Sequence, residues 1–186
     1  MKLVLTVMAV LILLVVGVAV FVGLGVYNVS ARVPHRNITL WFLEKVRQQS
    51  IFIRSKQIPT LPSENAEREN IGFRHYHAMC RVCHGAPGHA QTEIPKGLYP
   101  KPPEYKSKNV QRWRDTEVYW IVENGIKMTG MPAFGPTHSK GELGGIVVFV
   151  RELPNLSAKE YQAMVEAGGF KEEGIENHHH GKGKQK

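Results

Sequence analysis

The chain begins with an unbroken apolar stretch. Leu3–Val26 contains no charged side chain, and as an α-helix it would be about 36 Å long, whereas the hydrocarbon core of a bilayer is about 30 Å thick. This pattern predicts a single N-terminal transmembrane anchor within residues 1–31. A cleaved signal peptide is the alternative, and Val29-Ser30-Ala31 loosely fits its cleavage site. The apolar core of such a peptide is usually only about 7–15 residues long, however.

The next stretch, residues 32–61, mixes apolar and basic side chains and is expected to form a juxtamembrane stalk. In a helix over Ile38–Ile58, the side chains of Phe42, Val46 and Ile53 fall near one face, and the polar residues fall mostly elsewhere. Two interpretations stay open. The helix lies on the membrane or on a partner subunit, with Trp41 at headgroup level, or its apolar residues pack against the domain that follows.

Helical periodicity dominates the rest of the chain. Apolar spacing and capping residues predict helices from Ser63 to about Cys80, from Asp115 to Gly125, from about Lys140 to just before Pro154, and briefly after Ser157. The stretches 85–103 and 127–136 between them are expected to be loops, and the first is rich in Gly and Pro. No convincing strand and no internal repeat is visible. The predicted fold class is all-α, with a domain at residues 62–154 and a short helix and a His- and Lys-rich tail at residues 155–186.

The net charge of +8 is unevenly distributed. Residues 32–56 contain six basic side chains and one acidic side chain, whereas residues 62–154 contain 12 basic and 10 acidic side chains. Proteins that bind nucleic acid usually concentrate basic residues on the folded domain, so we expect no nucleic-acid partner. A basic juxtamembrane segment is better suited to anionic lipid headgroups.

The only two cysteines belong to the sequence Cys80-Arg81-Val82-Cys83-His84, a C-x-x-C-H motif typical of covalent haem attachment. Positions i and i+3 lie on the same side of a helical turn, so both thiols can bond to one edge of a haem while the imidazole of His84 reaches the iron. A zinc site would need a second pair of ligands, and a thiol–disulfide site would need a βαβ context. Neither is visible in the sequence.

At this point the chain resembles a class I c-type cytochrome of the short, membrane-anchored bacterial kind. Gly72-x-x-x-Tyr76-x-x-x-Cys80-x-x-Cys83-His84 resembles the first helix of that family. In the family this glycine lets the last helix approach closely, and the aromatic residue packs at the crossing.

Two further segments carry the resemblance, which covers residues 62–154. Phe149 stands where the family has an aromatic residue on its final helix, and Asn124–Phe134 resembles the loop that carries the methionine ligand. The resemblance implies a small all-α cytochrome c fold around one covalently bound haem c.

The same resemblance implies roles for four residues. Cys80 and Cys83 would attach the haem, His84 would be the proximal iron ligand, and Met131, followed by Pro132, would be the distal ligand. A soft thioether is the usual partner of histidine in such electron carriers.

Other residues near the motif allow more than one interpretation. Met128 and His138 are the alternative distal ligands. A carbonyl near Pro95 or Pro100 is expected to orient the imidazole of His84.

Arg114 and Trp113 either contact a haem propionate or are a solvated arginine beside a core tryptophan. His178–His180 either bind a transition metal or belong to a tail without a site.

The implied function is the transfer of single electrons, and the protein is not expected to be an enzyme by itself. A two-haem peroxidase would need a second C-x-x-C-H motif, which the sequence lacks. A haem sensor, in which a ligand displaces the methionine, is the remaining alternative. The expected partners are the membrane and redox proteins that act as electron donor and acceptor, with the chain as a free carrier or as a subunit of a respiratory complex.

The expected location is the cytoplasmic (inner) membrane, with one membrane pass and the haem domain on the periplasmic side. The charge bias argues weakly against this side, because Arg32 and Arg36 follow the apolar stretch and only Lys2 and the amino terminus precede it. The haem motif is the stronger indication, because c-type haem is attached after export.

Overall fold

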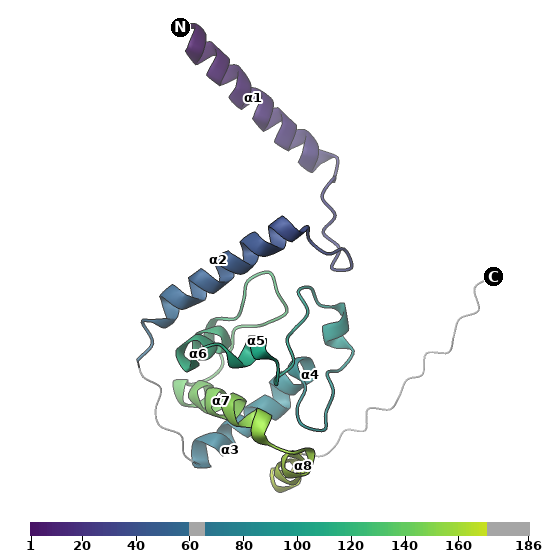
Figure 1. Cartoon of the computed structure of the whole chain (residues 1–186), viewed down its shortest axis with the longest axis vertical. Coiled ribbons are helices and arrows are strands. Elements are labelled where there is room, and N and C mark those ends of the chain that lie inside the picture. Colours follow the sequence, from purple (N-terminus) through teal and green to yellow (C-terminus); the bar gives the residue numbers. More distant parts are fainter. Residues whose placement is uncertain (60–65, 171–186) are drawn as a thin grey trace, which may run out of the picture.

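The computed structural model describes residues 1–59 and 66–170, in which helices are joined by loops and no strand occurs. The all-α prediction is therefore confirmed. α1 (Lys2–Gly23) stands apart, α2 (Asn37–Ser55) follows it, and the later helices pack into a domain (Figure 1). The elements of the domain are α3 (Ala66–His75), the π-helix η1 (Tyr76–Cys80), α4 (Arg81–His84), the 3₁₀-helix η2 (Ile94–Gly97), α5 (Lys108–Gln111), α6 (Asp115–Asn124), α7 (Lys140–Glu152), the 3₁₀-helix η3 (Leu153–Asn155) and α8 (Ala158–Ala167).

α1 has the length and composition of a membrane-spanning helix. Its mean hydropathy is 3.2, and none of its side chains is buried within the protein. A helix so close to the N-terminus would have the same properties if it were a signal sequence. The helix fits the predicted single-pass anchor, and it ends three residues before the apolar stretch does.

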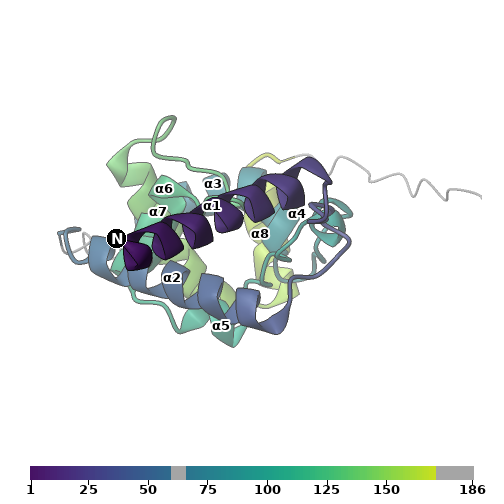
Figure 2. The same cartoon turned by 90° about the horizontal axis from the view of Figure 1, so that it is seen from above.

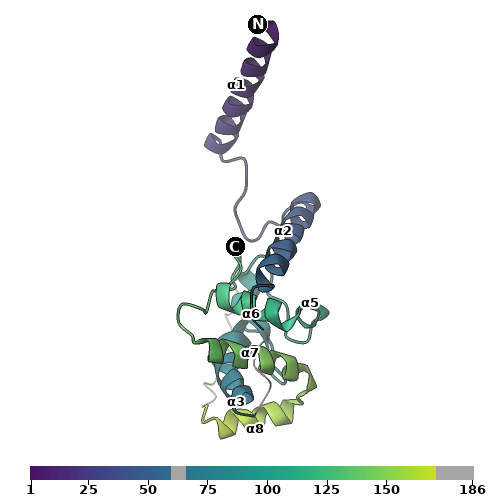
Figure 3. The ribbon, with the colours of Figure 1, turned by 90° about the vertical axis from the view of Figure 1, so that its left-hand side faces the viewer.

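α2 lies on the side of the domain that faces α1 (Figures 1 and 3), and in the view from above both helices lie over the domain (Figure 2). It packs against α6 and buries Ile51 and Ser55. By contrast, Phe42, Val46 and Ile53 are exposed. These three residues therefore do not pack on the domain, whereas Ile51 and Ile58 of the same segment do.

The closest helix contact joins α3 to α7. A Cβ atom added to Gly72 would lie 2.0 Å from the carbonyl oxygen of Gly145 and 2.8 Å from Cβ of Phe149. Phe149 is completely buried, and its ring centroid lies 5.6 Å from that of Tyr76. The predicted crossing of the first and last helices, with a glycine and two aromatic residues at the contact, is therefore confirmed.

The helix that begins with α3 extends further than the sequence predicts, and its hydrogen-bonding pattern changes along its length. Instead of ending near Cys80, it changes to a π-helical turn over Tyr76–Cys80 and continues as α4 to His84. A π-helical turn inserts one residue into a helix and is often found at functional sites. Apolar periodicity does not reveal such an insertion. The predicted start at Ser63 lies outside the described residues.

Ser157 caps α8 as predicted, and Ser139, which was not among the predicted caps, caps α7. The hydroxyl oxygens of Ser139 and Ser157 accept hydrogen bonds from backbone N–H groups at the starts of α7 and α8. α6 is different, because its N-cap is Arg114, whose backbone N–H donates to the carboxylate of Glu117 at 2.7 Å. Asp115 is therefore the first helical residue and not the cap.

α8 lies beyond the predicted boundary at residue 154, yet it contributes to the same hydrophobic core. Tyr161 and Val165 are almost completely buried. The Tyr161 hydroxyl forms a 3.0 Å hydrogen bond with Nδ1 of His77, and the ring of Phe170 packs against the His77 imidazole. The first helix of the domain therefore has helices on two sides, α7 and α8.

The crossing generates a prediction for Gly72→Ala. The new methyl group would overlap backbone atoms of α7, so the two helices must separate, and we expect the free energy of unfolding to fall by about 3 kcal/mol or more. Chemical denaturation of the detergent-solubilised protein measures this change. Gly141→Ala in α7 is the matched control, because nothing lies closer than 3.9 Å to its added Cβ. The prediction fails if both variants are equally stable.

The buried His77 generates a second prediction. Desolvation by burial, followed by the nearby charges of Arg81 and His89, lowers the pKa of His77 from 6.5 to about 4. Between these values the unfolded chain binds a proton that the folded protein does not, so the free energy of unfolding should fall as the pH is lowered from 6.5 to 4. In His77→Gln this fall should be smaller, which urea denaturation at pH 7 and pH 4.5 can measure. If the free energy of unfolding fell equally in the parent protein and in His77→Gln, His77 would not be the source of this pH dependence.

Candidate functional site

The two cysteines lie one helical turn apart, where the π-helix passes into α4. Both are free thiols, Cys80 being buried and Cys83 half-buried. Burial, and secondarily the neighbouring Cys83, raises the pKa of Cys80 to about 12. The helix thus places two free thiols three residues apart, as attachment to one edge of a haem requires.

His84 ends α4, and a backbone carbonyl fixes its imidazole. Its Nδ1 lies 2.7 Å from the carbonyl oxygen of Pro103, and because a carbonyl can only accept, Nδ1 carries the proton and donates. This leaves the lone pair on Nε2 for a metal. Burial lowers the pKa of His84, although the hydrogen bond to the Pro103 carbonyl has the opposite effect. The lowered pKa favours the neutral ring.

The acceptor comes from the predicted Pro-rich loop, three residues after Pro100. Several hydrogen bonds set the path of this loop. The Tyr76 hydroxyl donates to the Gly85 carbonyl at 2.7 Å, and Gln91 Nε2 donates to the carbonyls of Cys83 at 2.7 Å and Pro102 at 3.1 Å. Sequence reasoning assigned no role to Gln91, although a glutamine in a loop of Gly and Pro is a signal for such bonds.

The loop after α6 carries Met131, and hydrogen bonds fix its backbone on both sides. The Met131 carbonyl accepts from the Ile126 N–H at 3.1 Å, and the Met131 N–H donates to the Thr129 hydroxyl at 3.1 Å. That hydroxyl in turn donates to the Ile126 carbonyl at 2.8 Å. The Met131 side chain is partly buried and packs against the core. The loop therefore holds the Met131 thioether next to the core.

The loop that follows His84 and the loop that carries Met131 contact each other. A Cβ atom added to Gly130 would lie 2.5 Å from Cδ1 of Leu98, so the Leu98 side chain packs directly on the backbone next to Met131. The two predicted iron ligands thus come from segments that are distant in sequence but joined by packing.

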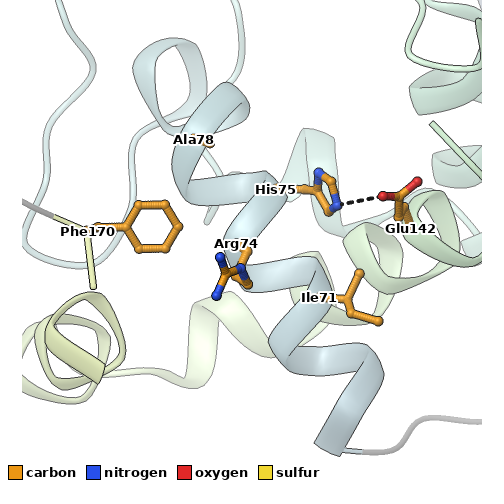
Figure 4. A pocket seen from close by; sticks show the side chains of 6 residues that line it. All are labelled: Ile71, Arg74, His75, Ala78, Glu142 and Phe170. Atoms are coloured by element: carbon orange, nitrogen blue, oxygen red, sulfur yellow. Dashed lines mark ion pairs between the residues drawn. The ribbon is translucent and has the colours of Figure 1, made fainter. Parts of the chain in front are cut away.

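The alternative distal ligands are less well placed. Met128 is 89 % exposed and has a φ of +61°, at the outer edge of its loop. His138 Nδ1 lies 2.9 Å from the Thr137 hydroxyl, and its ring packs edge-on against His75. His75 in turn pairs with Glu142 at 3.4 Å beside a shallow hollow that none of the four predicted haem residues lines (Figure 4).

Arg114 and Trp113 have protein partners. The Arg114 guanidinium donates to Glu117 at 2.9 Å and lies 5.0 Å from the centroid of the Phe52 ring in α2. Trp113 packs against the core, and its carbonyl accepts a hydrogen bond from Arg151. Arg114 therefore connects α6 to α2.

Within residues 1–59 and 66–170, no three His, Cys, Asp or Glu side chains converge so as to hold a metal ion. His178–His180 lie outside the described residues.

Comparison with known proteins adds a family. Residues 67–150 match the family described as cytochrome c oxidase, cbb3-type, subunit III, and no curated protein matches the chain significantly. The donor set fits the haem that this family implies, with two free thiols on one helical turn and an imidazole whose Nε2 is available. Residues 67–150 are thus a c-type cytochrome domain that binds haem c covalently, in a chain whose N-terminal helix fits a membrane anchor.

Proposed function

We propose that this protein is a monohaem c-type cytochrome that transfers single electrons at the outer face of an energy-transducing membrane. One observation carries the proposal. The C-x-x-C-H segment forms a helical turn, and the bond from His84 Nδ1 to the Pro103 carbonyl leaves Nε2 free for the metal.

Each residue of the site has a defined task. Cys80 and Cys83 would attach the haem through thioether bonds, and His84 and Met131 would ligate its iron. The bound haem supplies a one-electron couple. Because both iron ligands would be side chains of this chain, no ligand position would remain for O₂ or peroxide, which favours electron transfer over catalysis.

Met131 is preferred to Met128 because hydrogen bonds fix its backbone and because its side chain is less exposed. Hydrogen bonds on both sides of Met131 fix its position, whereas the Met128 side chain is almost fully exposed to solvent. A fixed ligand needs little rearrangement when the charge on the metal changes.

The outer face follows from the chemistry of attachment, since c-type haem is joined to the protein after export. With α1 as an anchor in the cytoplasmic membrane, the domain would then lie in the periplasm. Electron donors and acceptors are redox proteins of the same membrane. The family description names an oxidase subunit, which supports a place in a respiratory complex.

Covalent attachment is tested by acid–acetone extraction of protein matured in a host that makes cytochrome c. We expect the pigment to remain with the polypeptide, and we expect Cys80→Ser together with Cys83→Ser to abolish this retention. A colourless protein, or a double variant that retains its full pigment, would overturn the proposal.

The distal ligand is tested by Met131→Ala with Met128→Ala as the matched control. In Met131→Ala we expect loss of the weak near-infrared band of sulfur-to-iron charge transfer and a lower reduction potential, because a thioether favours the reduced metal. The control should keep both properties. Rapid and complete binding of carbon monoxide to the reduced parent protein at neutral pH would favour a sensor instead.

A further inference from the structure

α2 has an unusual distribution of side chains. The face that packs on the domain is polar over much of its length, with half-buried Glu44, Arg47 and Gln48 above the buried Ile51 and Ser55. Glu44 accepts from Arg47 and Gln48 and lies 3.4 Å from Arg112 of the domain. Of these bonds, the one between Glu44 and Arg112 joins α2 to the domain, and the other two lie within α2.

The opposite face of α2 is apolar. At about 100° per residue, six large apolar side chains fall within an arc of about 140°. One of them, Phe52, is 39 % exposed and lies against Arg114 of the domain, and the other five are 49–68 % exposed. These five side chains, called the outer face of α2 below, are Ile38, Trp41, Phe42, Val46 and Ile53. An apolar face on a surface helix is typical of a binding surface.

The position of α2 indicates what covers this face. The helix lies between α1 and the domain (Figures 1 and 3). Residues 24–36 connect it to α1, and 13 residues span at most about 45 Å when fully extended. With α1 in a bilayer, α2 thus remains close to the membrane surface, at a high effective concentration.

The charges of this segment favour an anionic surface. Residues 32–56 contain six basic side chains and one acidic one, and that acid, Glu44, is already paired with Arg47 and Arg112. Lys45 and Lys56 are exposed and fall within the arc of the outer face. Apolar and aromatic residues together with lysines are typical of a helix that lies in the headgroup region of a membrane.

We propose that the outer face of α2 lies on the anionic lipid surface next to α1, so that α1 and α2 hold the domain at two points. Because α2 packs against α6 and its Glu44 pairs with Arg112, the domain then has a fixed orientation relative to the membrane. The positive-inside bias alone would put the basic residues after α1 on the cytoplasmic side. Binding to anionic lipid headgroups would explain why they lie on the outer side instead.

The test places a single cysteine on the outer face in the full-length protein. Phe42→Cys and, separately, Ile53→Cys are reconstituted in nanodiscs containing anionic phosphatidylglycerol and are labelled with a polar maleimide. Lys159→Cys, at an exposed position of α8, is the matched control. The parent protein supplies the background from Cys80 and Cys83, and each rate is divided by that of the urea-unfolded protein.

We expect positions 42 and 53 to react at least about tenfold more slowly than position 159. The double variant Lys45→Gln, Lys56→Gln should reduce this protection in anionic nanodiscs, by roughly fivefold per charge, and should change nothing in nanodiscs of zwitterionic phosphatidylcholine.

Three results would overturn the proposal. The first is equal reactivity at positions 42, 53 and 159 in anionic nanodiscs. The second is protection that occurs in native membranes only, which would assign the outer face to a protein partner. The third is equal protection in zwitterionic and anionic lipid, which would remove the role of charge. None of these readouts depends on the haem.

Discussion

The contact between Gly72 and Gly145 is the constraint on which the rest of the domain depends. Because neither residue has a Cβ, the backbones of α3 and α7 meet directly, and Tyr76 and Phe149 pack beside the contact. This crossing fixes the direction of the chain just before Cys80. The Tyr76 hydroxyl then reaches the Gly85 carbonyl just beyond the haem motif. Helix packing and loop geometry are thus joined through one aromatic residue.

Two loops complete the site beside the helical turn of the cysteines, and these loops pack against each other. One loop supplies the carbonyl of Pro103 to His84 and the side chain of Leu98 to the backbone at Gly130. The other carries Met131 in a short network of hydrogen bonds with Ile126 and Thr129. A change in either loop should therefore be felt at both predicted ligands, although the ligands lie on different segments.

Much of this arrangement could be predicted from the sequence, because the relevant signals are local. Ser157 marks a helix start, and the C-x-x-C-H spacing indicates the haem. The π-helical turn and the choice of Pro103 as acceptor depend on tertiary packing and leave no such signal. In α2 the periodicity correctly grouped Phe42, Val46 and Ile53, but an apolar stripe does not reveal whether protein or lipid covers it.

The outward direction of that stripe has a practical consequence for handling the protein. Removing α1 is the usual way to turn an anchored cytochrome into a water-soluble fragment. A fragment that begins at residue 32 would still expose Ile38, Trp41 and Phe42 to water, and apolar patches of this kind promote self-association. Crystals or titrations of such a fragment would therefore require either a detergent or polar replacements along this helix, in addition to the truncation.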